Sequence, residues 1–150
     1  MSKPEFVISA CLCGQPTRYD GTAKPPIPEL AAMVESGRAV LVCPECMGGL
    51  PTPRPPAEIQ GDRVINANGV DVTPEYCRGA SKTLAVCRKY GITKAILKQN
   101  SPSCGSRAVY DGSFSKTLVN GRGFTADLLF KNGITVFDEH NWQEKTNASG

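Results

Sequence analysis

Apolar segments of strand length alternate with helical segments along most of this 150-residue chain, and this alternation restricts the fold more than any other feature. Strands are predicted at four apolar runs: Phe6–Cys11, Ala39–Cys43, Ile92–Lys98 and Ile134–Phe137. Helices are predicted between these runs: Pro28–Glu35, Thr73–Tyr90 and Thr125–Lys131. Strands that alternate with helices are typical of parallel sheets covered on both faces. We therefore predict an α/β fold, a three-layer Rossmann-like open sheet that is mainly parallel.

Glycine and proline mark the ends of several segments. Thr73 precedes Pro74 and is the predicted N-cap of the longest helix, which is expected to end at Gly91. Asn68-Gly69 predicts a type I′ turn, and with it a small β-hairpin over residues 63–72. The proline-rich residues 47–56 are predicted to form a long loop. Because the chain has no internal repeat, residues 1–150 are expected to form a single domain.

Composition narrows the range of ligands and compartments. The net charge is +3 and no lysine or arginine cluster accompanies it, which argues against a nucleic-acid surface. No run approaches the ~18 apolar residues of a membrane span, and the polar start of the chain does not resemble a signal peptide. We expect a cytoplasmic protein, either a monomer or a homodimer. Seven cysteines, an odd number, then favour metal binding or thiol chemistry over disulfides.

The spacing of the cysteines separates them into two groups. Cys77 and Cys87 lie ten residues apart on one predicted helix, so they are about 15 Å apart along its axis and cannot share a metal ion. Both are expected to be core residues. Cys11 and Cys43 end two of the predicted strands and Cys104 comes shortly after a third, and the carboxyl ends of parallel strands are where ligands collect.

Several kinds of thiol site remain compatible with this spacing. Cys11 and Cys13, taken with Cys43 and Cys46, could form a closed four-cysteine zinc site. The alternatives are an iron–sulfur cluster, a dithiol redox site and inert thiols. Cys104, left over by the zinc hypothesis, sits in a loop rich in serine, proline and glycine.

Polar side chains accompany the cysteines at the same predicted edge. Glu45 follows Cys43 by two residues and is a candidate general acid or base. Ser101 and Ser103 bracket a proline just before Cys104, and Arg18 and Asp20 follow the first strand, where they could line a polar pocket. His140, in the polar tail, is expected to be a surface residue.

An ordered series of segments over nearly the whole chain resembles a known family. They are Ile8–Leu12, Arg18–Gly21, Cys43–Glu45, Gly48–Arg54, Pro56–Glu58, Gly69–Thr73, Ala95–Lys98, Ser101–Gly105 and Tyr110–Phe114. The chain is similar to the domain of unknown function 523 family, whose characterised members include thiouracil desulfurases (TudS). Cys13 and Cys46 depart from the family pattern, in which aliphatic residues are more usual at these positions.

The resemblance implies an enzyme and a cofactor. It implies a [4Fe-4S] cluster held by Cys11, Cys43 and Cys104, with one iron free to bind the sulfur of the substrate. It also implies Glu45 and Ser101 as catalytic residues. The expected reaction is the non-redox desulfuration of 2-thiouracil or 4-thiouracil to uracil and hydrogen sulfide. Thiolated nucleosides or tRNA bases are alternative substrates, and a non-catalytic zinc or iron–sulfur protein is the alternative of another class.

Overall fold

A four-stranded sheet forms the centre of the fold in the computed structural model, which describes residues 4–23 and 25–143. Its strands, in spatial order, are β2 (Ala39–Val42), β1 (Phe6–Ser9), β5 (Lys94–Leu97) and β8 (Thr135–Asp138). All three neighbouring pairs are parallel. The mainly parallel open sheet predicted from the alternating pattern is therefore confirmed.

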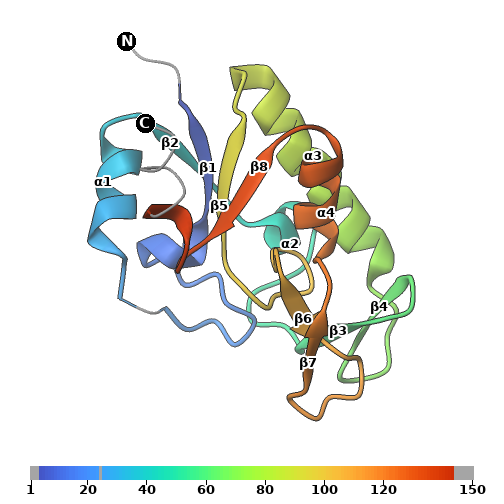
Figure 1. Ribbon diagram of the computed structural model, residues 1–150. Coiled ribbons are helices and arrows are strands. Elements are labelled where there is room, and N and C mark those ends of the chain that lie inside the picture. The colour runs from blue at the N-terminus through green and yellow to red at the C-terminus, as the bar shows by residue number, and fades with distance from the viewer. Residues whose placement is uncertain (1–3, 24, 144–150) are drawn as a thin grey trace.

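Helices cover both faces of this sheet, which gives three layers (Figure 1). One face packs against α1 (Pro28–Glu35), where Ile8 and Ile96 form a core with Leu30. The other face packs against α3 (Thr73–Tyr90) and α4 (Phe124–Lys131), where Val7 and Leu97 are part of the core. Successive strand residues thus point to opposite layers, as the two-residue period of a strand requires.

Two small antiparallel hairpins lie beyond the carboxyl ends of the central strands (Figure 1). The first pairs β3 (Ala57–Gln60) with β4 (Arg63–Asn66), and the second pairs β6 (Ala108–Tyr110) with β7 (Leu118–Asn120). The hairpin predicted over residues 63–72 is present in short form: an antiparallel bridge joins Ile65 and Asp71, and backbone hydrogen bonds of 2.9 Å run from Asn66 N to the Val70 carbonyl and from Val72 N to the Val64 carbonyl. The turn is not type I′, because Gly69 but not Asn68 has a positive φ.

The segments that follow β1 and β2 are helical rather than extended. The first strand ends at Ser9, two residues earlier than predicted, and continues into the 3₁₀ helix η1 (Ala10–Cys13). A short helix, α2 (Pro44–Met47), follows β2 and was not predicted. At α3 the predicted N-cap Thr73 is the first helical residue instead, and its backbone N–H donates to the Asp71 carboxylate at 2.9 Å.

Helices α2 and α3 touch at two glycines. An added Cβ at Gly48 would lie 1.9 Å from the carbonyl oxygen of Glu75, and one at Gly79 would lie 1.9 Å from that of Pro44. Glycine is therefore required at both positions, because any side chain would separate the two helices. The contact brings the acidic first turn of α2 against the first turns of α3.

Candidate active site

The carboxyl ends of β1, β2 and β5 border a cavity of about 520 Å³. Because β2 and β5 lie on opposite sides of β1, this is the point where the connections diverge, and open α/β sheets bind ligands there. Cys11, Cys43 and Cys104 all line the cavity. They come from η1, from the residue before α2, and from the loop after β5.

Burial disfavours the charged form of all three thiols. It raises the pKa of Cys43 to about 12, and raises the pKa values of Cys104 and Cys11 as well. Lys98, which also lines the cavity, opposes this effect at Cys11. Cys104 is buried and Cys11 and Cys43 are half-buried, so the three thiols ionise together most readily when a bound cation compensates their charge, and thiolates prefer soft metals.

The arrangement fits a polynuclear group better than a single ion. Three thiolates around one tetrahedral zinc ion would lie about 3.8 Å apart, given Zn–S bonds of about 2.3 Å. Within residues 4–23 and 25–143, no three His, Cys, Asp or Glu side chains are grouped closely enough to hold a single metal ion. Cys13 packs against the core beside α1, and Cys46 contacts Thr52, so neither side chain lines the cavity. A four-cysteine zinc site is not supported by this arrangement.

The Glu45 carboxylate faces the cavity from the first turn of α2. Its Oε2 accepts hydrogen bonds from Arg54 Nε and from the Tyr76 hydroxyl, both at 3.1 Å. Its Oε1 accepts from the Ser101 hydroxyl at 3.4 Å. Burial, followed by the Glu45 charge, raises the pKa of Tyr76, so this hydroxyl is a donor and not a base.

Arg54 is the most extensively bonded side chain at the cavity. Besides Glu45, its guanidinium donates to the Thr17 and Pro51 carbonyls and to the Thr52 hydroxyl at 3.0, 3.3 and 3.0 Å. Its side chain is only 5% exposed. Burial alone would lower the pKa of Arg54, but the Glu45 carboxylate raises it above its ordinary value. The guanidinium is therefore charged and ties two loops, its own and the one that carries Thr17, to α2.

Ser101 both orders the loop that carries Cys104 and contacts Glu45. Its Oγ accepts from the backbone N–H groups of Ser103 and Cys104, at 3.0 and 3.1 Å. These two bonds use its lone pairs, so its single proton is directed to Glu45. The serine thus orders the loop that carries Cys104 and also contacts the acid.

Two of the residues predicted to bind substrate do not reach the cavity. The Ser103 hydroxyl is fully buried and bonds to Thr125 Oγ1 at 2.8 Å, in the direction of α4. Asp20 is exposed and accepts from Thr22, whose hydroxyl lowers its pKa. Arg18 does line the cavity. The loops turn the side chains of Ser103 and Asp20 away from the cavity in this structure, and their roles in substrate binding stay predictions.

Other predicted positions have mixed outcomes. Cys87 is buried as expected, whereas Cys77, also predicted to be a core residue, is exposed. His140 is exposed, as predicted. All seven cysteines lie in the part of the chain that the structure describes, and all are free thiols.

The sequence reasoning missed Arg54, Tyr76 and the loop between β6 and β7. Arg54 lay hidden in a proline-rich loop, and Tyr76 has the helical spacing of an ordinary core residue. From the β6–β7 region, Phe114 and other residues line the cavity. The Glu58 carboxylate holds this region by accepting from Gly112 N and Phe114 N at 3.0 and 3.2 Å. The signal available in the sequence was Glu58, an acid that directly follows the proline-rich loop and that the structure buries.

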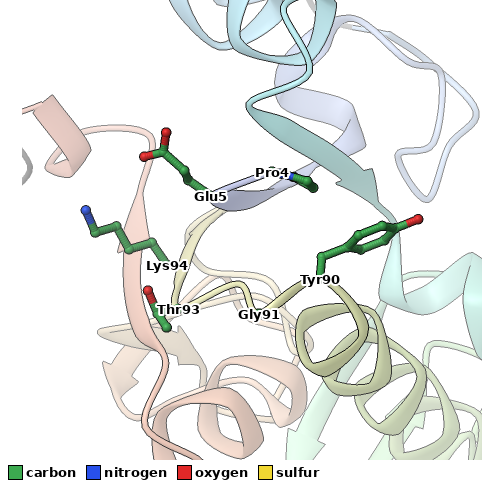
Figure 2. Close-up of a pocket in the computed structure, with 6 residues that line it drawn as sticks. All are labelled: Pro4, Glu5, Tyr90, Gly91, Thr93 and Lys94. Atoms are coloured by element: carbon green, nitrogen blue, oxygen red, sulfur yellow. The ribbon is translucent and has the colours of Figure 1, made fainter. Parts of the chain in front are cut away.

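A second, smaller cavity of about 340 Å³ lies at the opposite end of the sheet (Figure 2). Figure 2 shows its lining residues, which come from the chain before β1, from the end of α3, from the turn after it and from the start of β5. It contains no thiol, and its one acid, Glu5, pairs with Arg38 at 3.5 Å. The thiols and the buried acid are therefore found at the carboxyl ends of the strands and not in this second cavity.

No helix in the described part of the chain is long and apolar enough to cross a membrane.

Comparison with known proteins agrees with the arrangement of this cavity. Among solved structures, the chain is similar to the [4Fe-4S]-dependent thiouracil desulfidase TudS, with 48% sequence identity and a TM-score of 0.92, covering 98% of each chain. It is also 40% identical to the uncharacterized protein YbbK of Bacillus subtilis (strain 168), over 90% of this chain and 95% of YbbK. A family model described as 2-thiouracil desulfurase matches residues 6–141. The resemblance stated from the sequence is thereby confirmed, and this chain belongs to the 2-thiouracil desulfurase family.

Proposed function

We propose that this chain is a thiouracil desulfidase that converts 2-thiouracil or 4-thiouracil and water into uracil and hydrogen sulfide. The observation that carries the proposal is the meeting of three thiols, one buried and two half-buried, with Glu45 and Ser101 around one cavity. The 48% identity to a [4Fe-4S]-dependent thiouracil desulfidase over 98% of the chain supports the same reaction and the same cofactor.

The donor set fits a [4Fe-4S] cluster held by Cys11, Cys43 and Cys104. Buried thiols whose pKa values are raised ionise when a cationic cluster binds them, and three ligands leave one iron without a protein thiolate. When bound, the cluster supplies a Lewis-acidic iron that draws charge from the thiocarbonyl carbon through its sulfur. No change in oxidation state is required.

The protein's own side chains supply the proton transfer. Glu45 accepts a proton from the attacking water at Oε1, the oxygen that faces Ser101, and returns it to the leaving sulfur. The second water proton leaves the added hydroxyl as the uracil carbonyl forms and completes hydrogen sulfide. The Ser101 hydroxyl holds Oε1 in place through its own proton. Arg18 lines the cavity, where its guanidinium can donate hydrogen bonds to the polar edge of the substrate base.

We propose a small free base as the substrate, a cytoplasmic location and no nucleic-acid partner. The modest net charge of +3 favours a small ligand over a polyanion, and cluster ligation favours a compartment that keeps seven cysteines reduced.

The test is anaerobic purification followed by quantification of iron and sulfide and a sulfide-release assay with 2-thiouracil, 4-thiouracil and 4-thiouridine. We expect brown protein and release from at least one free base. Cys11→Ser, Cys43→Ser and Cys104→Ser should each lose the cluster, whereas Cys13→Ser and Cys46→Ala should keep most of the iron. Cys77→Ser is the matched control, because this thiol is exposed on α3.

Three outcomes would contradict the proposal. Colourless protein that contains zinc would contradict the proposed iron–sulfur cofactor. Sulfide release from 4-thiouridine alone would show that the substrate is a nucleoside and not a free base. Retention of iron without Cys104 but not without Cys46 would overturn the ligand set.

A further inference from the structure

Two donors converge on one oxygen of Glu45 and leave the other nearly free. Arg54 Nε and the Tyr76 hydroxyl both bond to Oε2 at 3.1 Å, whereas Oε1 has only the longer bond from Ser101 at 3.4 Å. A carboxylate oxygen accepts about two hydrogen bonds. The capacity of Oε2 is therefore used, and Oε1 keeps a lone pair for a proton.

We infer that Arg54 and Tyr76 are positioning residues, which fix the Glu45 carboxylate so that Oε1 is the atom that accepts the proton in the reaction. The inference rests on the proposed function, in which Glu45 is the base. Arg54 and Tyr76 act through Glu45 and not on the substrate.

The direction of the Arg54 bond is set by contacts at the other end of its guanidinium. This group is planar, so bonds from Nη1 to the Thr52 hydroxyl and from Nη2 to the Thr17 carbonyl, both at 3.0 Å, also fix the direction of Nε–H. With 5% of the side chain exposed, water has little access to compete for these donors.

The direction of the Tyr76 bond is set by packing. Its ring lies edge-on against Phe124, with centroids 6.4 Å apart and planes at 77°. Tyr76 lies on α3 next to Glu75, whose carbonyl oxygen is in the close contact with Gly48. Donors on rigid, packed elements hold a carboxylate more narrowly than a loop can.

The first test is Tyr76→Phe, which keeps the ring and its packing but removes the hydroxyl. With iron-matched, reconstituted protein, we expect kcat to fall about 10- to 100-fold, as for a base misplaced by a fraction of an ångström, while KM stays the same. Arg54→Lys keeps the positive charge but loses the planar set of N–H donors, and should lower kcat in the same way. Tyr90→Phe, in the remote cavity of Figure 2, is the matched control and should leave kcat unchanged.

A double-variant experiment distinguishes positioning from a direct role. If Tyr76 acts only through Glu45, then Tyr76→Phe should lower kcat in the native background and have no effect in a Glu45→Gln background. A further loss in the double variant would overturn the inference, because Tyr76 would then contact the substrate or the cluster.

A spectroscopic measurement tests the same contacts without turnover. The Glu45 carboxylate band, assigned by infrared difference against Glu45→Gln, should shift in Tyr76→Phe and in Arg54→Lys but not in Tyr90→Phe. An unshifted band, or native kcat in both variants, overturns the inference and leaves the proposed function intact. Native kcat in Glu45→Gln is a different result, because it removes the base itself.

Discussion

Replacing Gly79 by alanine sets two effects of known size against each other. In the interior of a helix, alanine is normally more stable than glycine by about 1 kcal/mol. At this position the added Cβ would lie 1.9 Å from the Pro44 carbonyl oxygen, and since real Cβ atoms stay beyond 3.0 Å, α2 must retreat from α3 by about 1.1 Å. Overpacking typically costs about 1–3 kcal/mol, and a clash with backbone belongs at the upper end because backbone cannot change rotamer.

The net effect of Gly79→Ala is therefore destabilisation by about 1–2 kcal/mol, or a Tm lower by about 2–8 °C. The retreat of α2 also carries Glu45 away from the Tyr76 hydroxyl, now 3.1 Å from it, and a shift of about 1 Å can lower the rate about 100-fold. Calorimetry gives the Tm, and sulfide release well below the Tm gives the rate. Ser81→Ala, on the exposed side of the same helix, is the control and should change stability by less than about 0.5 kcal/mol.

A Gly79→Ala variant with a higher Tm than the native protein would refute this reasoning. Helix propensity would then be the larger effect, and the close approach of α2 to α3 would not exist in solution.

Three further results are expected. Ser101→Ala should lower iron content as well as rate, since the N–H of Cys104 loses its acceptor; full iron content with reduced rate would restrict this serine to proton transfer. Glu58→Ala should raise KM more than it lowers kcat, because it releases the backbone at Phe114 on the cavity wall; an unchanged KM would contradict a role for this region in binding. The cluster-free protein should lose stability as the pH rises above about 8.5, where a free thiol ionises in the unfolded chain while Cys43, with its pKa of about 12, stays protonated in the folded one. Urea unfolding at pH 7 and pH 10 measures this loss, and Cys43→Ser should reduce it; equal losses in both proteins would show that this thiol is not the cause.

The parts of the fold that follow from side-chain periodicity could be predicted. Four apolar runs of strand length separated by helices are typical of a parallel sheet buried on both faces, and in such a sheet the carboxyl ends of the strands lie at the same edge. Cys11, Cys43 and Cys104 could be assigned to one edge for this reason, although they lie far apart in the chain.

The parts of the site that depend on loops could not be predicted. In a tight loop, successive side chains point in unrelated directions, so Ser101 faces Glu45 while Ser103 faces Thr125. Arg54 gained its role from contacts with α2 and with Thr17, which neither periodicity nor turn preference encodes. The strands of the β6–β7 hairpin are three residues each, too short for an alternating pattern to be recognised.

The three cavity thiols come from the segments that follow three different strands, spread from residue 11 to residue 104. In this they differ from ligands clustered within one short segment, which a growing chain could present before the rest of the protein exists. Here β1, β2 and β5 must all be paired before the three sulfurs are near one another. Any group that they hold must therefore arrive after the sheet has formed and enter through the mouth of the cavity. Assembly of the holoprotein then depends on an already folded apoprotein, and its lifetime before loading is governed by the stability of the sheet itself.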